Sequence, residues 1–584
     1  MTTGLHYRVT RLDTHAHQFH LELTIACPAA QQVVQLPTWI AGSYLVREFA
    51  KQLSGLTARQ SGRTRIVQQL DKASWQIDCV ADQPLTLRWQ VYAHDASVRT
   101  AWLDTSRAFF NGTSLFLQVV GQTEQAHALD LAADVAPASW RVATGLRANK
   151  VNKRGFGSYV AANYDELVDC PVEMGDFWSA EFKACGVVHQ FVVAGATPSL
   201  DGQRLLTDAQ KICETQIRFW HGKGKPPHDR YVFMLWAVGE GYGGLEHRNS
   251  TALICNRNDL PRTGHKGGEG YTTLLGLISH EYFHTWNVKR LRPHEFARYD
   301  YSQENYTELL WFFEGFTSYY DDLLLCRAGL VDHSQYLKLL NKTINQVLQT
   351  PGRRVHTVAQ SSFEAWTKYY RTDENSPNLT VSYYTKGALV ALCLDLSLRS
   401  EGHSLDNMMR RLWQRCGAGP MQESDVLAVL QELTGHSWQQ ALNAWVHSTQ
   451  ELPLQALLQA HGVKVHQDPA QWTQRLGLRV TETQGIHVKT VLDDSAARAA
   501  GFAPGDEWLG IEVPAGKGHS ASAWRLNRVD ELPLYAGGAS RVTALVARDR
   551  QLLRLPLSLK GLDQVTTWRL ALDQPEPVKR WLLG

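Results

Sequence analysis

The chain has 584 residues, of which 44% are hydrophobic, 20% charged and 10% aromatic, and its formal net charge is +2. This length exceeds what one hydrophobic core supports, and the composition excludes a disordered or fibrous chain. Because acidic and basic residues are interspersed and nearly balanced, we expect neither a nucleic acid nor an anionic membrane as a partner.

The start of the chain and its cysteines favour a cytoplasmic protein. From Met1 the sequence runs directly into polar, strand-like residues, so we expect no secretory signal. No apolar run approaches the roughly 20 residues that span a bilayer. The nine cysteines are odd in number and include no CxxC pair, which is typical of reduced core residues rather than of a disulfide framework.

Three patterns follow one another along the chain, and they predict a multidomain α+β protein. Residues 19–25 and 85–91 alternate apolar and polar side chains, as strands do. Longer stretches with helical spacing then follow, before short strands and turn signals return. We expect an N-terminal all-β domain over 1–168, a mainly helical domain over 169–462, a small β module over 463–562 and a C-terminal tail over 563–584.

The helical section predicts helices over 272–287, 307–328, 387–412 and 424–432. The first of these begins with Thr272 and Thr273, which are suitable N-cap residues. It contains the sequence H-E-Y-F-H at 280–284, which follows the pattern HExxH.

The HExxH pattern on a helix predicts a metal site with a catalytic base. Four residues advance the helix by about 400°, so His280 and His284 project from one face and can both ligate Zn²⁺. Glu281 is rotated by about 100° from His280, which places a carboxylate where an attacking water needs a base. The plain alternative is a surface helix that carries two unrelated histidines.

A zinc site of this type needs a third protein ligand, and a carboxylate from a second helix is a common solution. Glu314 stands alone in the apolar and aromatic sequence W-F-F-E-G-F-T-S-Y-Y. An unpaired carboxylate there would be costly to bury, and ligation of zinc would remove that cost. Glu304 and Glu308 are nearer to the motif in sequence. However, we expect Glu304 to lie in a loop and Glu308 to be a solvated acid in the first turn of a helix, so Glu314 is preferred as the ligand.

These residues together resemble the gluzincin peptidases, in which W-x-x-E-G-F follows HExxH and supplies the third ligand. The 29 residues between His284 and Glu314 make a longer interval than in the large aminopeptidases of that clan. This interval, the sequence H-E-Y-F-H-T-W-N and the module after the catalytic domain resemble the M61 family, the glycyl aminopeptidases. The resemblance implies a thermolysin-like catalytic domain with one Zn²⁺ per chain.

Upstream, the sequence G-E-G-Y-G-G-L-E-H at 239–247 resembles the loop that binds the substrate's amino terminus in related aminopeptidases. Glu246 would then hold the free α-ammonium of the substrate, and Gly243 and Gly244 would allow close approach of its backbone. An ordinary glycine-rich turn with a solvated glutamate is the alternative.

Downstream, Y-Y-T-K-G at 383–387 resembles the Y-x-K-G segment whose tyrosine hydroxyl binds the oxyanion of the transition state. That role falls to Tyr384, and a neutral phenol suits it because it stabilises developing charge. The neighbouring Tyr383 stays open as the donor, and either tyrosine could simply pack in the core.

The last module resembles PDZ domains of the bacterial protease type. The resemblance rests on D-S-A-A-R-A-A-G-F-A-P-G-D at 494–506, and it makes 475–478 the loop that receives a peptide C-terminus. A module that only packs on the catalytic domain is the alternative.

The resemblance therefore implies a zinc aminopeptidase that takes peptides with a free N-terminus and prefers glycine or alanine there. One alternative is a zinc endopeptidase whose PDZ-like module presents polypeptide substrates. Another is a non-catalytic protein that binds partners through its PDZ-like module.

Overall fold

The structure is a computed structural model that describes residues 4–516 and 520–584. Its contacts divide the chain into two compact units, which we describe separately. The first unit consists of Met1–Tyr306, Tyr320–Val331 and Arg410–Gln422, and the second of Thr307–Tyr319, Asp332–Met409 and Glu423–Gly584.

The first unit begins with a large β-sheet whose core follows the alternation seen in the sequence. Strands β2 and β8 pair so that Phe19 lies opposite Val91 and Leu23 opposite Leu87, and all four side chains are buried. The sheet has the order β14 (Arg147–Val151), β15 (Gly157–Ala161), β12 (His127–Leu131), β1 (Leu5–Asp13), β2 (Gln18–Ile25), β8 (Leu85–Tyr92), β4 (Leu53–Gln60), β5 (Arg63–Arg65).

Two smaller sheets complete this β-rich region, which confirms the prediction of an N-terminal β domain. Strand β16 pairs with both β10 and β13, so strand pairing continues past the expected boundary at 168. One sheet has the order β13 (Arg141–Thr144), β16 (Val172–Gly175), β10 (Arg107–Phe110), β9 (Ala101–Leu103), and the other β11 (Gln118–Val119), β3 (Gln31–Gln35), β7 (Ser74–Asp78), β6 (Val67–Gln69).

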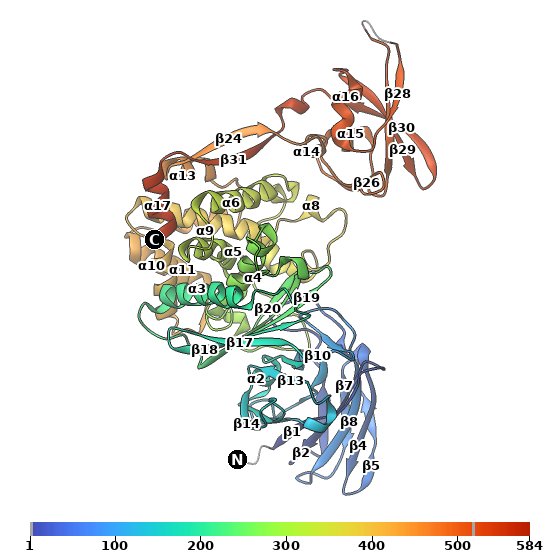
Figure 1. The fold of residues 1–584 in the computed structure, drawn as a ribbon, viewed down its shortest axis with the longest axis vertical. Coiled ribbons are helices and arrows are strands. Elements are labelled where there is room, and N and C mark those ends of the chain that lie inside the picture. The colour runs from blue at the N-terminus through green and yellow to red at the C-terminus, as the bar shows by residue number, and fades with distance from the viewer. Residues whose placement is uncertain (1–3, 517–519) are drawn as a thin grey trace. The chain divides into compact units, whose positions relative to one another are not determined.

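A five-stranded sheet follows, which the sequence analysis did not predict. Its central strands β18, β19 and β21 are parallel, and the outer strands β17 and β20 are antiparallel to their neighbours. Helices α3 (Gly202–His221) and α4 (Glu269–Phe283) lie on one face of it (Figure 1). The order is β17 (Trp178–Ala184), β18 (Val187–Ala194), β19 (Arg230–Val238), β21 (Ser250–Asn256), β20 (Gly243–Glu246).

Helix α4 carries the HExxH motif, but it begins earlier than predicted. Gly268 is its N-cap, so the expected caps Thr272 and Thr273 lie inside the helix. Their hydroxyls donate to the carbonyls of Gly268 and Glu269, four residues earlier, which lets threonine occupy the first turns. His284 is the C-cap residue, and its N–H still bonds to the carbonyl of His280.

The middle of the chain is helical, as predicted. The helix expected over 387–412 is interrupted, because Gly402 adopts a φ of 81° and ends the first segment in the left-handed manner typical of glycine. The main helices are α5 (Leu310–Arg327), α6 (His333–Leu348), α9 (Tyr383–Ser400), α10 (Leu405–Arg415), α11 (Glu423–Thr434) and α13 (Leu454–Ala460).

Within the second unit, α5 and α9 cross in close contact. A Cβ atom on Gly315 would lie 2.5 Å from the Cα of Gly387, and one on Gly387 would lie 2.5 Å from the carbonyl oxygen of Trp311. Glycine is required at both positions, because side chains would push the helices apart. This explains the glycines of the motifs W-x-x-E-G-F and Y-x-K-G.

The last part of the second unit is a separate sheet with its own core, around residues such as Trp508 and Ile511. Strand β24 (Val463–Pro469) precedes this sheet in the chain and β31 (Thr566–Leu572) follows it. The two strands pair with each other as an antiparallel ribbon (Figure 1). The sheet runs β25 (Leu478–Thr481), β26 (Ile486–Val491), β27 (Glu507–Val513), β29 (Arg541–Arg548), β30 (Gln551–Ser558), with β28 (Ser522–Arg525) also on β27.

The residues expected to form a C-terminal tail belong to ordered elements instead. They contribute β31 and helix α17 (Pro575–Leu583). Trp581 of α17 is buried and donates from its indole N–H to the hydroxyl of Tyr319 at 3.0 Å. Short segments of this kind gain order from long-range packing, which the local sequence pattern does not report.

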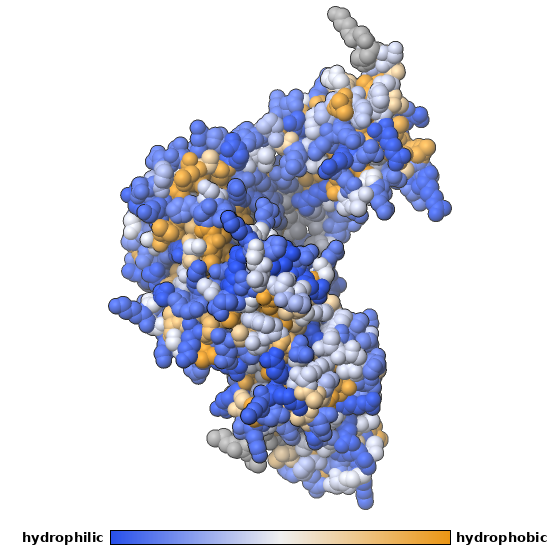
Figure 2. Space-filling view, viewed as in Figure 1, coloured by the Kyte–Doolittle hydropathy of each residue, from blue (hydrophilic) through white to orange (hydrophobic). Residues whose placement is uncertain are grey.

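The surface of the protein is mainly hydrophilic. Hydrophilic residues cover most of the face seen in Figure 2, with hydrophobic ones scattered among them. Among the described residues, no helix has the length and apolar character needed to cross a membrane.

Candidate active site

The two histidines of the HExxH motif face each other at the end of α4. The Nε2 atoms of His280 and His284 are 3.1 Å apart. Nδ1 of His284 donates to the carbonyl oxygen of Asn287 at 2.8 Å, and Nδ1 of His280 lies 3.0 Å from Oδ2 of Asp321. These partners place the ring protons on Nδ1, so the two Nε2 lone pairs point toward each other.

Such an arrangement fits a bound metal ion. Two lone pairs this close repel unless a cation lies between them, and a tetrahedral Zn²⁺ with N ligands at 2.0–2.1 Å requires an N···N separation of about 3.3 Å. Glu314, the third ligand that the sequence predicts, is buried on α5 in the second unit. Two imidazoles and one carboxylate are the donors of a catalytic zinc site with an open position.

Asp321, which accepts a hydrogen bond from His280, is a candidate site residue that the sequence analysis did not identify. It lies seven residues after Glu314 on α5, which is close to two helical turns and therefore on the same face. That spacing was the available signal. Burial raises the pKa of the Asp321 carboxyl, and its hydrogen bond with His280 partly offsets this effect.

We expect Asp321→Asn to weaken zinc binding about 10- to 100-fold, because the carboxylate orients His280 and increases its basicity as a ligand. The dissociation constant can be measured by titrating the metal-free protein against a chromophoric chelator. Asp78→Asn, at an exposed position on β7, is the control and should bind zinc as the wild type does. Equal affinity of both variants would contradict the assigned role of Asp321.

Glu281 and Glu246 lie together beside His284. Ligand atoms of these three residues are within 4.8 Å of one another, and both carboxylates are about 95% buried. Oε1 of Glu246 has no hydrogen-bond partner in the described part of the chain. A buried carboxylate oxygen without a donor is costly, and a substrate cation would satisfy it.

Strand β20 lies at the end of its sheet, next to Glu281. A Cβ atom on Gly244 would be only 2.0 Å from Oε1 of Glu281, whereas one on Gly243 would have its nearest neighbour, Nη1 of Arg99, at 3.7 Å. Gly244 and Glu246 share one face of the strand because side chains alternate. A side chain is therefore sterically excluded at Gly244 but not at Gly243.

The tyrosines at the start of α9 lie near Glu314 within the second unit. Desolvation raises the pKa of Tyr384 well above its usual value, and the charge of Glu314 raises it further. The phenol thus stays protonated and can donate a hydrogen bond. Tyr383 is fully buried and stacks on Tyr384 at 4.7 Å. The half-buried Tyr384 is the better placed of the two to meet a ligand.

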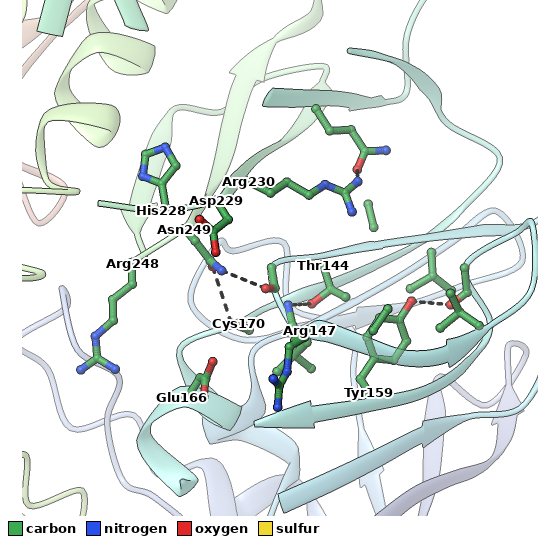
Figure 3. A pocket seen from close by; sticks show the side chains of 18 of the residues that line it. Thr144, Arg147, Tyr159, Glu166, Cys170, His228, Asp229, Arg230, Arg248 and Asn249 are labelled. Carbon is green, nitrogen blue, oxygen red and sulfur yellow. Dashed lines mark hydrogen bonds between the residues drawn. The ribbon is translucent and has the colours of Figure 1, made fainter. Parts of the chain in front are cut away.

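A large cavity of the first unit lies elsewhere, and none of these residues lines it. It has a volume of about 910 Å³ and is rich in arginine. Figure 3 shows that the side chains of Arg147, Arg230 and Arg248 point in different directions. Arg248 pairs with Asp165, and Arg290 donates only to main-chain carbonyls. Because its cations do not converge, we assign no binding site to this cavity.

Comparisons with known proteins identify the class of the chain. The sequence model of the M61 glycyl aminopeptidases matches residues 273–390, and that of the peptidase M61 N-terminal domain matches residues 6–176. The crystal structure of an aminopeptidase N family protein from Idiomarina loihiensis is 37% identical and has a TM-score of 0.90. The match covers 99% of this chain and all of that one.

Other matches are more distant. Two crystal structures of M1 zinc metallopeptidase from Deinococcus radiodurans, one of them of a mutant, are 14% and 13% identical, with TM-scores of 0.47 and 0.48. Each match covers 77% of this chain, and 93% and 94% of the other. A search of curated protein sequences found no match.

The family models and the Idiomarina structure together indicate that this protein is a peptidase. It contains domains of the M61 glycyl aminopeptidase family and is similar over its length to an aminopeptidase N family protein.

Proposed function

We propose that this protein is a zinc-dependent aminopeptidase that releases small N-terminal residues from peptides. The observation that carries the proposal is the buried carboxylate of Glu246, which lies within 4.8 Å of ligand atoms of Glu281 and His284. An anion held this close to the catalytic base can bind a substrate ammonium only if the scissile bond is near the N-terminus.

His280, His284 and Glu314 would hold one Zn²⁺ per chain. When bound, the ion would polarise the scissile carbonyl and lower the pKa of the attacking water. Glu281 takes the proton of that water and returns a proton to the leaving amine. Tyr384 donates its hydroxyl proton in a hydrogen bond to the oxyanion, and the edge of β20 at Gly243 and Gly244 aligns the substrate backbone.

The preference for glycine or alanine at the N-terminus rests on the family resemblance. The short distance between the Glu246 carboxylate and the base supports the release of a single N-terminal residue. The description of the matching family as glycyl aminopeptidases supports the same preference.

The proposal is tested by hydrolysis of Gly- and Ala-p-nitroanilide beside their N-acetylated forms. We expect the zinc-loaded protein to cleave the free amines and to lose this activity on acetylation, because acetylation removes the ammonium that Glu246 binds. Chelation of the metal should abolish cleavage, and added zinc should restore it.

Two results would support the rival functions. Equal cleavage of acetylated and free substrates would favour an endopeptidase. No cleavage of any peptide by zinc-loaded protein would favour a non-catalytic binding protein.

For the C-terminal module we propose a PDZ-like role in binding peptide C-termini. Asp506, at the start of β27, is fully buried, accepts the N–H of Ala503 and pairs with Arg548. This contact stabilises the turn of the motif G-D. The side chain of Asn378 also bonds to the main chain of the module at Val491 and Asp493, as expected if the module packs against the helical part of its unit. Location in the cytoplasm stays a prediction.

A further inference from the structure

A turn of the N-terminal β region, Ile40–Ser43, reaches the carboxylate of Glu246. The N–H of Ser43 donates to the carbonyl of Ile40 at 3.1 Å, and Gly42 has a φ of 91°. A positive φ at the third residue is typical of a type II turn, and glycine adopts it without strain. A Cβ atom on Gly42 would lie 2.5 Å from Oε1 and 2.6 Å from Oε2 of Glu246. The main chain at Gly42 therefore packs against the two oxygens that would bind the substrate's ammonium.

This turn is itself held in place by the residues around it. The indole N–H of Trp39, just before the turn, donates to the carbonyl oxygen of Asp300 at 2.7 Å. At the other end, Nη2 of Arg47 donates to the hydroxyl of Ser43 at 2.7 Å. Trp39 and Ser43 are fully buried. In the contact between the turn and Glu246, the flexible glutamate side chain is thus the partner that must adapt.

The strand that carries Glu246 is fixed from a second direction. His247 is the next residue, and its Nδ1 lies 3.2 Å from Oδ1 of Asp169. The same oxygen pairs with Nζ of Lys289 at 2.7 Å, and all three side chains are buried. A buried network of this kind is rigid when its members are satisfied. It fixes the main chain at the end of β20, while the turn confines the carboxylate.

Such confinement matters for a carboxylate that has to recognise a cation. Glu246 is almost fully buried, and its Oε1 has no hydrogen-bond partner in the part of the chain that the structure describes. Ordering a free glutamate side chain on binding costs conformational entropy. A side chain that packing already holds in place avoids much of this cost, which increases affinity for the ligand.

We propose that Gly42 is a positioning residue of the amine anchor. By packing against the carboxylate of Glu246, the turn Ile40–Ser43 holds it ready for the substrate's ammonium. The N-terminal β domain thereby takes part in selecting substrates with a free amino group. This inference rests on the proposed aminopeptidase function and adds the element that positions its anchor.

The test measures binding of alanine hydroxamate and of propionohydroxamate to zinc-loaded protein by titration calorimetry. Both ligands carry the same metal-binding group, and only the first has an ammonium. We expect the wild type to bind alanine hydroxamate about 10- to 100-fold more tightly, the worth of a charge-assisted hydrogen bond. Gly42→Ala should remove most of this preference and leave the affinity for propionohydroxamate unchanged. Glu246→Gln should do the same, and adding Gly42→Ala to it should have no further effect.

Two further variants separate positioning from folding. Gly121 also has a positive φ, 85°, but a Cβ atom there would meet nothing within 4 Å. Gly121→Ala therefore introduces similar backbone strain without the contact and should keep the wild-type preference. Ser43→Ala removes the acceptor of the Arg47 hydrogen bond without a change in backbone conformation. It should lower the preference about 3-fold, which provides a test even if Gly42→Ala does not fold.

Several results would overturn the proposal. One is an unchanged preference in both Gly42→Ala and Ser43→Ala. Another is an equal loss of affinity for the two hydroxamates, which would mean that the turn supports the fold or the metal site and not the anchor. A loss in Gly121→Ala as large as in Gly42→Ala would assign the effect to backbone strain. Equal binding of both ligands by the wild type would instead show that Glu246 does not bind an ammonium, which is a failure of the proposed function itself.

Discussion

Glu281→Gln is expected to lower kcat about 10³- to 10⁴-fold, the upper range for loss of a general base. Glutamine has nearly the same shape, so the substitution removes the proton acceptor and leaves the packing at the end of α4. Because the carboxylate is about 95% buried, its replacement by a neutral amide should not lower the melting temperature. Rates with Ala-p-nitroanilide, zinc content and thermal unfolding together measure these effects.

The control for this variant is Glu269→Gln, which changes an exposed acid in the first turn of the same helix. It should keep wild-type kcat and one zinc per chain. A Glu281→Gln enzyme that keeps more than about a tenth of wild-type activity would contradict a base role, since general bases contribute at least 10²-fold.

Gly244→Ala is expected to lower kcat about 10²-fold although the added group is only a methyl. The new Cβ would lie 2.0 Å from Oε1 of Glu281, so the carboxylate must move. A displacement of about 1 Å from the productive geometry is enough to cost that factor. The clash extends to Cδ and Cγ of Glu281, at 2.4 and 2.6 Å, but it involves no backbone atom. We therefore expect the Glu281 side chain to rotate away and the free energy of unfolding to change little.

Gly239→Ala, in the loop that precedes β20, provides the matched comparison. A Cβ atom on Gly239 would have no neighbour within 4 Å, so this variant should keep wild-type kcat and stability. If Gly244→Ala were fully active, the carboxylate of Glu281 would not need its position beside β20. If it were instead strongly destabilised, the effect on kcat would report on folding and not on the base.

Much of the fold could be predicted because its signals are local. The alternation in 19–25 and 85–91 reports strands with one buried face, and the two segments turn out to be paired neighbours. Helical spacing in the middle of the chain is equally local. The five-stranded sheet was missed because its central strands are buried on both faces, so strands such as β19 are runs of apolar residues without alternation.

The site was predicted in outline for the same reason. The spacing of His280 and His284 places both rings on one face of a helix, whatever else the chain does. Asp321 was missed because its role depends on a partner 41 residues away in sequence.

The residues that supply the chemistry can be read directly from the sequence, namely two imidazoles, a neighbouring carboxylate and a lone glutamate in an apolar helix. How these groups are positioned depends on contacts between elements far apart in the chain. The tertiary structure brings Nε2 of one histidine to 3.1 Å from the other, aligns His280 with Asp321 and makes Gly244 a contact of the base. Side-chain type and helical spacing are properties of the local chain, whereas distances between elements are set by packing.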